Sequence, residues 1–131
     1  MSKIILKEES YKVIGAAMNV HSELGCGFLE QVYQEALGYE FKLSEIQFVR
    51  EKQIKIKYKN IELSKYYIAD FICYQKIILE LKALSEINTE HEAQLINYLK
   101  ATNLPLGILI NFGQSSLEYK RIPNKYYIST N

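Results

Sequence analysis

Several features that define whole classes of protein are scarce or missing in this chain of 131 residues. It has no tryptophan, two prolines and two cysteines, Cys26 and Cys73, which lie far apart in the sequence. That separation fits neither a disulfide framework nor a thiolate zinc site, and it favours a reducing cytoplasm. No apolar run reaches the roughly 18 residues of a membrane span, and the charged segment Met1–Glu9 does not resemble a secretory signal. The sequence therefore predicts a cytoplasmic protein that does not enter a membrane.

Charge of one sign is also scarce, because 16 Lys and Arg residues nearly balance 15 Asp and Glu residues and leave a net charge of +1. Strong non-specific binding of nucleic acid through counterion release is therefore not expected of the whole chain. One short segment differs, because lysines alternate there with apolar residues: Ile54, Lys55, Ile56, Lys57, Tyr58 and Lys59. It is either the solvated outer face of an edge strand or a local basic patch.

Apolar residues make up 48% of the chain, enough for the core of one domain that spans residues 1–131. Helical spacing predicts a first helix from Lys7 to Leu24, with an inner face of Tyr11, Ile14, Ala17, Met18 and Leu24. Gly25–Gly27 ends this helix. A second helix follows, with an inner face of Leu29, Val32, Tyr33, Ala36, Leu37, Phe41 and Leu43.

A period of two then predicts three strands joined by tight turns at Lys59–Asn60 and Tyr74–Gln75. The strands are Gln53–Lys59, Ile61–Cys73 and Lys76–Ala83. A capping box at Thr89–Glu92 opens a third helix, which runs to Ala101 before the stop signal Asn103–Pro105. Two further strands are expected at Leu106–Phe112 and Leu117–Ile122.

This order predicts an α/β (α+β) fold. A three-stranded antiparallel meander leads through a crossover helix to a parallel strand, which gives a mixed β-sheet flanked by helices.

The main candidate site lies in the meander, where Asp70 ends one apolar run and Glu80 and Lys82 lie in the next. Residues two apart on a strand project from the same face, so Glu80 and Lys82 share one. If the strands pair as a hairpin, Asp70 approaches the same face. Two carboxylates and an ammonium group there would suit metal-assisted hydrolysis of a phosphodiester. The alternative is a solvated face, although carboxylates in such apolar runs are costly unless they are paired or metal-bound.

The third helix carries a polar stripe in which His91, Gln94 and Tyr98 share a face with Leu95. It is either a hydrogen-bonded packing seam or the border of the site. Glu30, in the first turn of the second helix, is either a metal ligand or a favourable charge for the helix dipole. His21, in the last turn of the first helix, leaves the same choice between a ligand and a favourable terminal charge.

Taken together, these residues resemble the GxxExxY family of the PD-(D/E)XK nuclease superfamily. The naming motif is matched by Gly27-x-x-Glu30-x-x-Tyr33, followed by Ala36-Leu37. The other matching segments are His21-x-x-Leu24-Gly25-x-Gly27, Ala69-Asp70, Glu80-Leu81-Lys82-Ala83, His91 to Lys100, and Gly107 to Gly113. Gln94-x-x-x-Tyr98 is also similar to the motif after the catalytic lysine in exonuclease domains of bacterial recombination helicases.

The resemblance implies a restriction-endonuclease-like core in which Asp70, Glu80 and the Leu81 carbonyl bind Mg²⁺ or Mn²⁺. It implies that Glu30 completes the acidic set and that Lys82 activates or positions the attacking water. Gln94 and Tyr98 would support the site, and His21 matches a position where related exonucleases add a ligand.

The expected function is therefore metal-dependent hydrolysis of DNA phosphodiester bonds. Two alternatives remain at this stage: a module on the same fold that binds nucleic acid or protein without turnover, and a structural subunit whose acidic pocket binds metal only for stability. Small size and near-neutral charge favour a need for a protein partner or a homodimer.

Overall fold

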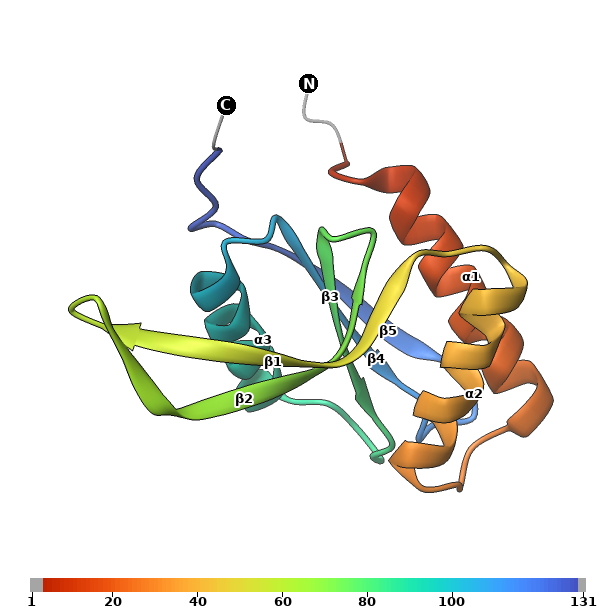
Figure 1. Ribbon diagram of the computed structural model, residues 1–131. Helices are drawn as coiled ribbons and strands as arrows, with labels where there is room; N and C mark the ends of the chain where they lie inside the picture. The colour runs from red at the N-terminus through yellow and green to blue at the C-terminus, as the bar shows by residue number, and fades with distance from the viewer. Residues whose placement is uncertain (1–3, 130–131) are drawn as a thin grey trace.

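The computed structural model describes residues 4–129. Its helices are α1 (Lys7–Leu24), α2 (Glu30–Leu43) and α3 (Thr89–Thr102). Its strands are β1 (Phe48–Tyr58), β2 (Ile61–Cys73), β3 (Ile77–Lys82), β4 (Leu106–Asn111) and β5 (Glu118–Pro123) (Figure 1). Within the described range, no helix has the length and apolar character needed to cross a bilayer.

The strands form one five-stranded sheet in the order β1-β2-β3-β4-β5. The β3–β4 pair is parallel, while the other three neighbouring pairs are antiparallel. The crossover between β3 and β4 runs through α3, as a parallel connection requires. The predicted mixed sheet with an antiparallel meander, a crossover helix and a parallel strand is thus confirmed, consistent with a restriction-endonuclease-like fold.

Helices cover both faces of the sheet, and each face has its own apolar cluster (Figure 1). Helices α1 and α2 pack on the face that presents Phe71, Leu79 and Ile108. Helix α3 packs on the opposite face, where Ile78 and Leu109 lie against it. A Cβ atom at Gly107 would come within 2.9 Å of Leu95, so the absence of a side chain there lets α3 lie directly on β4.

Both hairpin turns of the meander fall where the sequence predicts them. Lys59 and Asn60 have φ angles of 51° and 67°, and Tyr74 and Gln75 have 57° and 60°. Two consecutive positive φ angles are typical of the two-residue turns that match the twist of paired strands. These turns keep Asp70 and Glu80 level with one another on neighbouring strands.

The predicted inner faces of the two N-terminal helices are partly wrong. Tyr11 and Met18 are 80% and 48% exposed, because the buried stripe of α1 runs instead through Val13, Ala17 and Val20. On the second helix Tyr33, Leu37 and Phe41 are buried as expected. Leu29, the residue before the first helical turn, is 78% exposed, and Leu43 at the other end of the helix is 62% exposed.

Strand β1 begins at Phe48, five residues before the predicted start at Gln53. Its first half does not alternate cleanly, because Glu51 has a positive φ of 55° and interrupts the period of two. The earlier start places Arg50 within the sheet, and from there its side chain reaches Gln34 of α2.

Candidate active site

The site lies at a fork between β2 and β3. Their main-chain pairing ends at Phe71 and Leu79, directly before Asp70 and Glu80. Beyond that point β2 pairs with β1 alone. Hydrogen bonds that involve the Asp70 and Glu80 side chains join β2 to β3 in place of main-chain pairing. The Leu81 N–H donates to Asp70 Oδ2 at 2.8 Å, and the Asp70 N–H donates to Glu80 Oε1 at 3.4 Å. The fork therefore brings the two carboxyl groups together, as the hairpin prediction required.

Asp70 is also held from α2, by a residue that the sequence did not single out. Gln34 is buried and its Nε2 donates to Asp70 Oδ1 at 2.7 Å. Arg50 Nε on β1 donates to Gln34 Oε1 at 2.9 Å, which fixes the orientation of the Gln34 amide. A signal for Gln34 existed, because it follows Glu30 by four residues and so shares a helix face with it. Arg50 carried no such signal, since only the fold brings β1 beside α2.

Glu80 has a very different environment. Its side chain is only 6% exposed. Burial and the negative charge of Asp70 raise the pKa of Glu80 to about 9, against the opposing effects of its hydrogen bond from the Asp70 N–H and of the Lys82 charge. A carboxyl group in this position stays protonated near neutral pH unless a cation joins it.

Glu30 and Lys82 complete the same electrostatic neighbourhood. Glu30 is exposed, but partial desolvation raises its pKa, the charge of Asp70 adds to the rise, and Lys82 opposes it. Lys82 is half-buried and forms no ion pair within the described residues. The charges of Asp70 and Lys82 thus act on both Glu30 and Glu80, which come from α2 and β3.

The residues of the predicted polar stripe on α3 differ in their burial and in their contacts. Tyr98 is 5% exposed, and its ring centroid lies 5.3 Å from that of Tyr67 on β2. Burial, then the charges of Glu80, Tyr67 and Asp70, raise the pKa of Tyr98 to about 12, which places this residue beside the fork. Gln94 is exposed and has no hydrogen bond to any residue of the described part.

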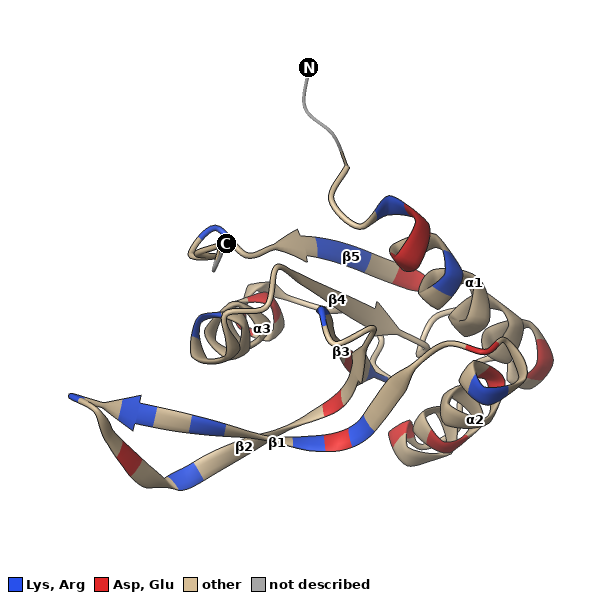
Figure 2. Ribbon diagram, turned by 45° about the horizontal axis from the view of Figure 1, so that its top comes forward, with Lys and Arg blue, Asp and Glu red and all other residues tan. Residues whose placement is uncertain are grey.

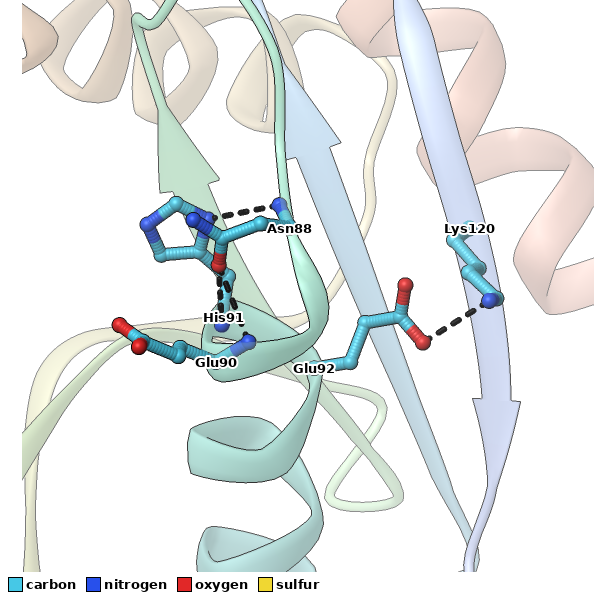
Figure 3. A network of polar contacts seen from close by, with 5 residues as sticks. All are labelled: Asn88, Glu90, His91, Glu92 and Lys120. Carbon is cyan, nitrogen blue, oxygen red and sulfur yellow. Dashed lines mark hydrogen bonds and ion pairs between the residues drawn. The ribbon is translucent and has the colours of Figure 1, made fainter.

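His91 belongs to the helix cap (Figure 3). Its Nδ1 accepts a hydrogen bond from the Asn88 N–H at 3.1 Å, while Asn88 Oδ1 accepts from the N–H groups of Glu90 and His91. The capping box therefore begins at Asn88, and the predicted box at Thr89–Glu92 is one residue late. Asn88 is the N-cap residue because its side chain accepts hydrogen bonds from two N–H groups of the first turn.

His21 packs against residues that follow β4. Its Nε2 lies 2.8 Å from the Gln114 carbonyl oxygen, and its ring lies 6.2 Å from that of Phe112. Phe112 in turn stacks on Tyr33, whose hydroxyl donates to the Gly25 carbonyl at 2.6 Å. These contacts hold the glycine loop that leads into Glu30, and none of them joins His21 to a carboxylate of the fork.

The donor set can be compared with the needs of a metal ion. Among residues 4–129, no group of three or more His, Cys, Asp and Glu side chains forms a ready metal centre. The fork supplies two adjacent carboxyl groups and only oxygen donors, which suits Mg²⁺ because that ion retains several waters. Because burial and the charge of Asp70 raise the pKa of Glu80, a cation bound there would favour the ionised form of Glu80. These residues fit a hydrated divalent cation.

Comparisons with known proteins agree with this geometry. The crystal structure of SSO0001 matches with a TM-score of 0.58 and 18% sequence identity, over 90% of this chain and 59% of that one. The chain thus spans less than two thirds of SSO0001, and the likeness concerns the fold. A comparison with curated proteins gave no match. The model of the PD-(D/E)XK nuclease superfamily matches residues 7–122, nearly the whole length. The chain belongs to the PD-(D/E)XK nuclease superfamily.

Proposed function

We propose that residues 1–131 form one nuclease domain of the GxxExxY type, which hydrolyses DNA phosphodiester bonds with Mg²⁺ or Mn²⁺. The observation that carries the proposal is the fork, where the buried carboxyl group of Glu80 lies beside Asp70 and Lys82. Family membership supports a nucleic acid as the substrate. The two free cysteines, one of them exposed, support a reducing compartment such as the cytoplasm.

Asp70, Glu80 and the Leu81 carbonyl are the proposed metal ligands, with Glu30 completing the acidic set. The Leu81 N–H points to the fork, and an extended residue directs its C=O toward the same neighbouring strand. When bound, the cation supplies charge for the phosphoryl oxygen and lowers the pKa of a water. Gln34 keeps the Asp70 carboxylate oriented, as residues behind a ligand commonly do.

Lys82 is the proposed positioning group for the attacking water. It shares a strand face with Glu80, and its ammonium group has no competing ion pair in residues 4–129. Tyr98 would border the same water from α3, with Gln94 and His91 nearer the helix surface as contacts for substrate. His21 is left with a packing role.

One observation favours a second candidate, a module that binds nucleic acid without turnover. Both carboxylate oxygens of Asp70 already accept hydrogen bonds, from Gln34 and from Leu81. A protein that had lost its metal would have use for such an arrangement, because it fixes the carboxylate internally.

An assay of metal dependence separates these candidates. Labelled single- and double-stranded DNA and RNA are incubated with Mg²⁺ or Mn²⁺, and with wild-type protein or Asp70→Ala. Cleavage that needs both metal and Asp70 supports the nuclease. Binding without cleavage of any substrate, equal in the two proteins, would replace it with the binding module.

A further inference from the structure

The hairpin of β1 and β2 extends past the fork as a two-stranded arm, residues 52–68 (Figure 1). The arm holds five of the 16 Lys and Arg residues of the chain and one of its 15 Asp and Glu residues. Its net charge is therefore +4, which leaves −3 for the rest of a chain whose total is +1. Figure 2 shows this basic character along the arm. The positive charge of this nearly neutral protein is thus concentrated on the arm, which extends from the fork that carries Asp70 and Glu80.

The lysines of the arm make few contacts with the rest of the described chain, and Lys59 Nζ lies 5.5 Å from the ring centroid of Tyr58, itself on the arm. The ion pair of the arm joins Lys55 to Glu62 at 3.6 Å, with both side chains more than half exposed. At the opposite edge of the sheet, by contrast, Lys120 is held by Glu92 at 2.8 Å (Figure 3). Arg121, also on β5, donates to Ser10 and Ile5. Basic residues on β5 serve the fold, whereas those on the arm face solvent.

The arm is fixed in position by one of its faces. Ile54 is 2% exposed and packs with Leu95 and Leu99 of α3, and Tyr67, directly opposite Ile54, contacts Tyr98. An isolated two-stranded ribbon is only marginally stable in water, so this anchor gives the arm its shape. The other face carries Lys55 opposite Tyr66, and Lys57 opposite Glu62.

Protection of an exposed strand edge would account for lysines alone, because charge prevents pairing with another chain. It does not account for the exposed apolar and aromatic residues between them. On the arm these are Tyr58, Ile61, Leu63, Tyr66, Tyr67 and Ile68, each at least 40% exposed. Lysines mixed with exposed aromatic rings are the pattern of surfaces that follow an unpaired nucleic acid strand, with phosphates on the cations and bases on the rings.

We propose that the arm binds the backbone of an unpaired nucleic acid strand and leads it to the fork. This rests on the proposed function, since Asp70 lies two residues after the arm and a strand held there would have its next phosphodiester at the carboxylates. Lys55, Lys57 and Lys65 contact phosphates, and Tyr66 stacks on a base. Glu62 competes with phosphate for Lys55.

The test is fluorescence anisotropy of a labelled single-stranded oligonucleotide in EDTA, over a series of salt concentrations. Lys55→Gln with Lys57→Gln should weaken binding about tenfold and reduce the slope of log affinity against log salt by about 1.4, from about 0.7 for each phosphate contact of a single strand. The matched control is Lys7→Gln with Lys12→Gln on α1, an equal loss of charge at exposed residues, and it should leave affinity and slope unchanged.

A variant with the opposite sign guards against a loss caused by misfolding. Glu62→Gln frees Lys55 and should tighten binding two- to threefold, while Glu8→Gln on α1, an equal change of charge, should not. The same sequence as a duplex should bind more weakly than the single strand, because its bases are not open to the tyrosine rings.

Equal losses in the arm variant and the α1 variant would overturn the proposal, as would duplex binding at least as tight as single-strand binding. So would arm variants that change only the oligomeric state in sedimentation, which would make the arm an interface between copies. If the wild type cleaves DNA and the arm variant matches it in binding and KM, the proposal for the arm is wrong and the proposed nuclease function still holds. If nothing is cleaved but binding still depends on Lys55 and Lys57, the nuclease proposal fails and the arm stands.

Discussion

The two sides of the fork treat neighbouring carboxyl groups in opposite ways. On the α2 side, Asp70 receives hydrogen bonds from Gln34 and Leu81, and Arg50 stands behind Gln34. On the α3 side, Glu80 is buried, its charge acts on Tyr98, and its own pKa rises to about 9. Both carboxylate oxygens of Asp70 accept hydrogen bonds from the protein, whereas the pKa of Glu80 is raised mainly because the group is buried.

This difference indicates how a site can be specific and also dependent on a cation. If the site binds a cation as proposed, the hydrogen-bonded carboxylate of Asp70 would set the geometry, and the buried carboxyl group of Glu80 would gain the most from the added positive charge. If both carboxyl groups were satisfied internally, nothing would favour the ion. If neither carboxyl group had hydrogen bonds within the protein, the folded state would contain two unpaired buried charges.

The largest expected effect comes from removing the charged groups themselves. Asp70→Ala and Glu80→Ala should abolish both metal binding and cleavage, since each removes a ligand. Lys82→Ala should lower the cleavage rate on the order of a thousandfold and keep metal binding, because an ammonium group is not a ligand. Metal binding is read from the melting temperature, since at ten times Kd a metal adds about 1.4 kcal/mol. Cleavage by Lys82→Ala at the wild-type rate would show that its role is assigned wrongly.

The second effect is on the pH dependence of stability in EDTA. Glu80 has a pKa of about 9 in the folded protein, against an ordinary value of 4.5, so unfolding releases its proton between these values. The free energy of unfolding should therefore fall as pH rises from about 5 to about 9, by on the order of a few kcal/mol. Urea unfolding at several pH values measures it, and Glu80→Gln should flatten the slope. A wild type that gains stability over this range would remove Glu80 as the neutral partner.

A smaller effect should follow from loosening the α2 side. Gln34→Ala removes one of the two donors to Asp70, so metal affinity should fall about tenfold while the fold persists. The matched control is Gln94→Ala, which loses the same side chain at an exposed position without a hydrogen bond in the described part. Calorimetric titration with Mn²⁺ compares them. Equal losses in the two variants would show that the Gln34 bond does not act on the site.

The smallest effect on stability should come from Tyr98→Phe. Its hydroxyl has no hydrogen bond within residues 4–129, so the cost should stay below about 1 kcal/mol. If the hydroxyl borders the attacking water, the cleavage rate of the folded variant should fall about tenfold with unchanged metal affinity. Full activity per folded molecule would return Tyr98 to the packing of α3 and limit the site to the α2 side with Glu80 and Lys82.

Local patterns predicted much of the fold. The bounds of α1 and β2 and the residues of both hairpin turns were foreseen, because helical spacing and turn chemistry act over a few neighbouring residues. The first half of β1 was not, since the positive φ of Glu51 breaks its alternation. Exposed Tyr11 and Met18 show a further limit, because spacing tells that a helix is amphipathic but not which partner sets its inner face.

For the site, the sequence predicted the charged residues but not their support. Asp70, Glu80 and Lys82 stand out because charges are unexpected within apolar strands. Gln34 and Arg50 look like ordinary surface residues until the fold places α2 over β1 and β2. How Asp70 and Glu80 differ also depends on burial, which no local pattern of residues records.

The bond from the Leu81 N–H to Asp70 Oδ2 gives the fork a built-in spectroscopic probe. One backbone amide of β3 has a carboxylate as its partner where its neighbours have carbonyl groups. Its proton resonance in a ¹⁵N-correlated NMR spectrum should move when metal is added, and its hydrogen exchange should quicken in Asp70→Ala. Assembly of the fork can thus be followed at a single peak, without any substrate.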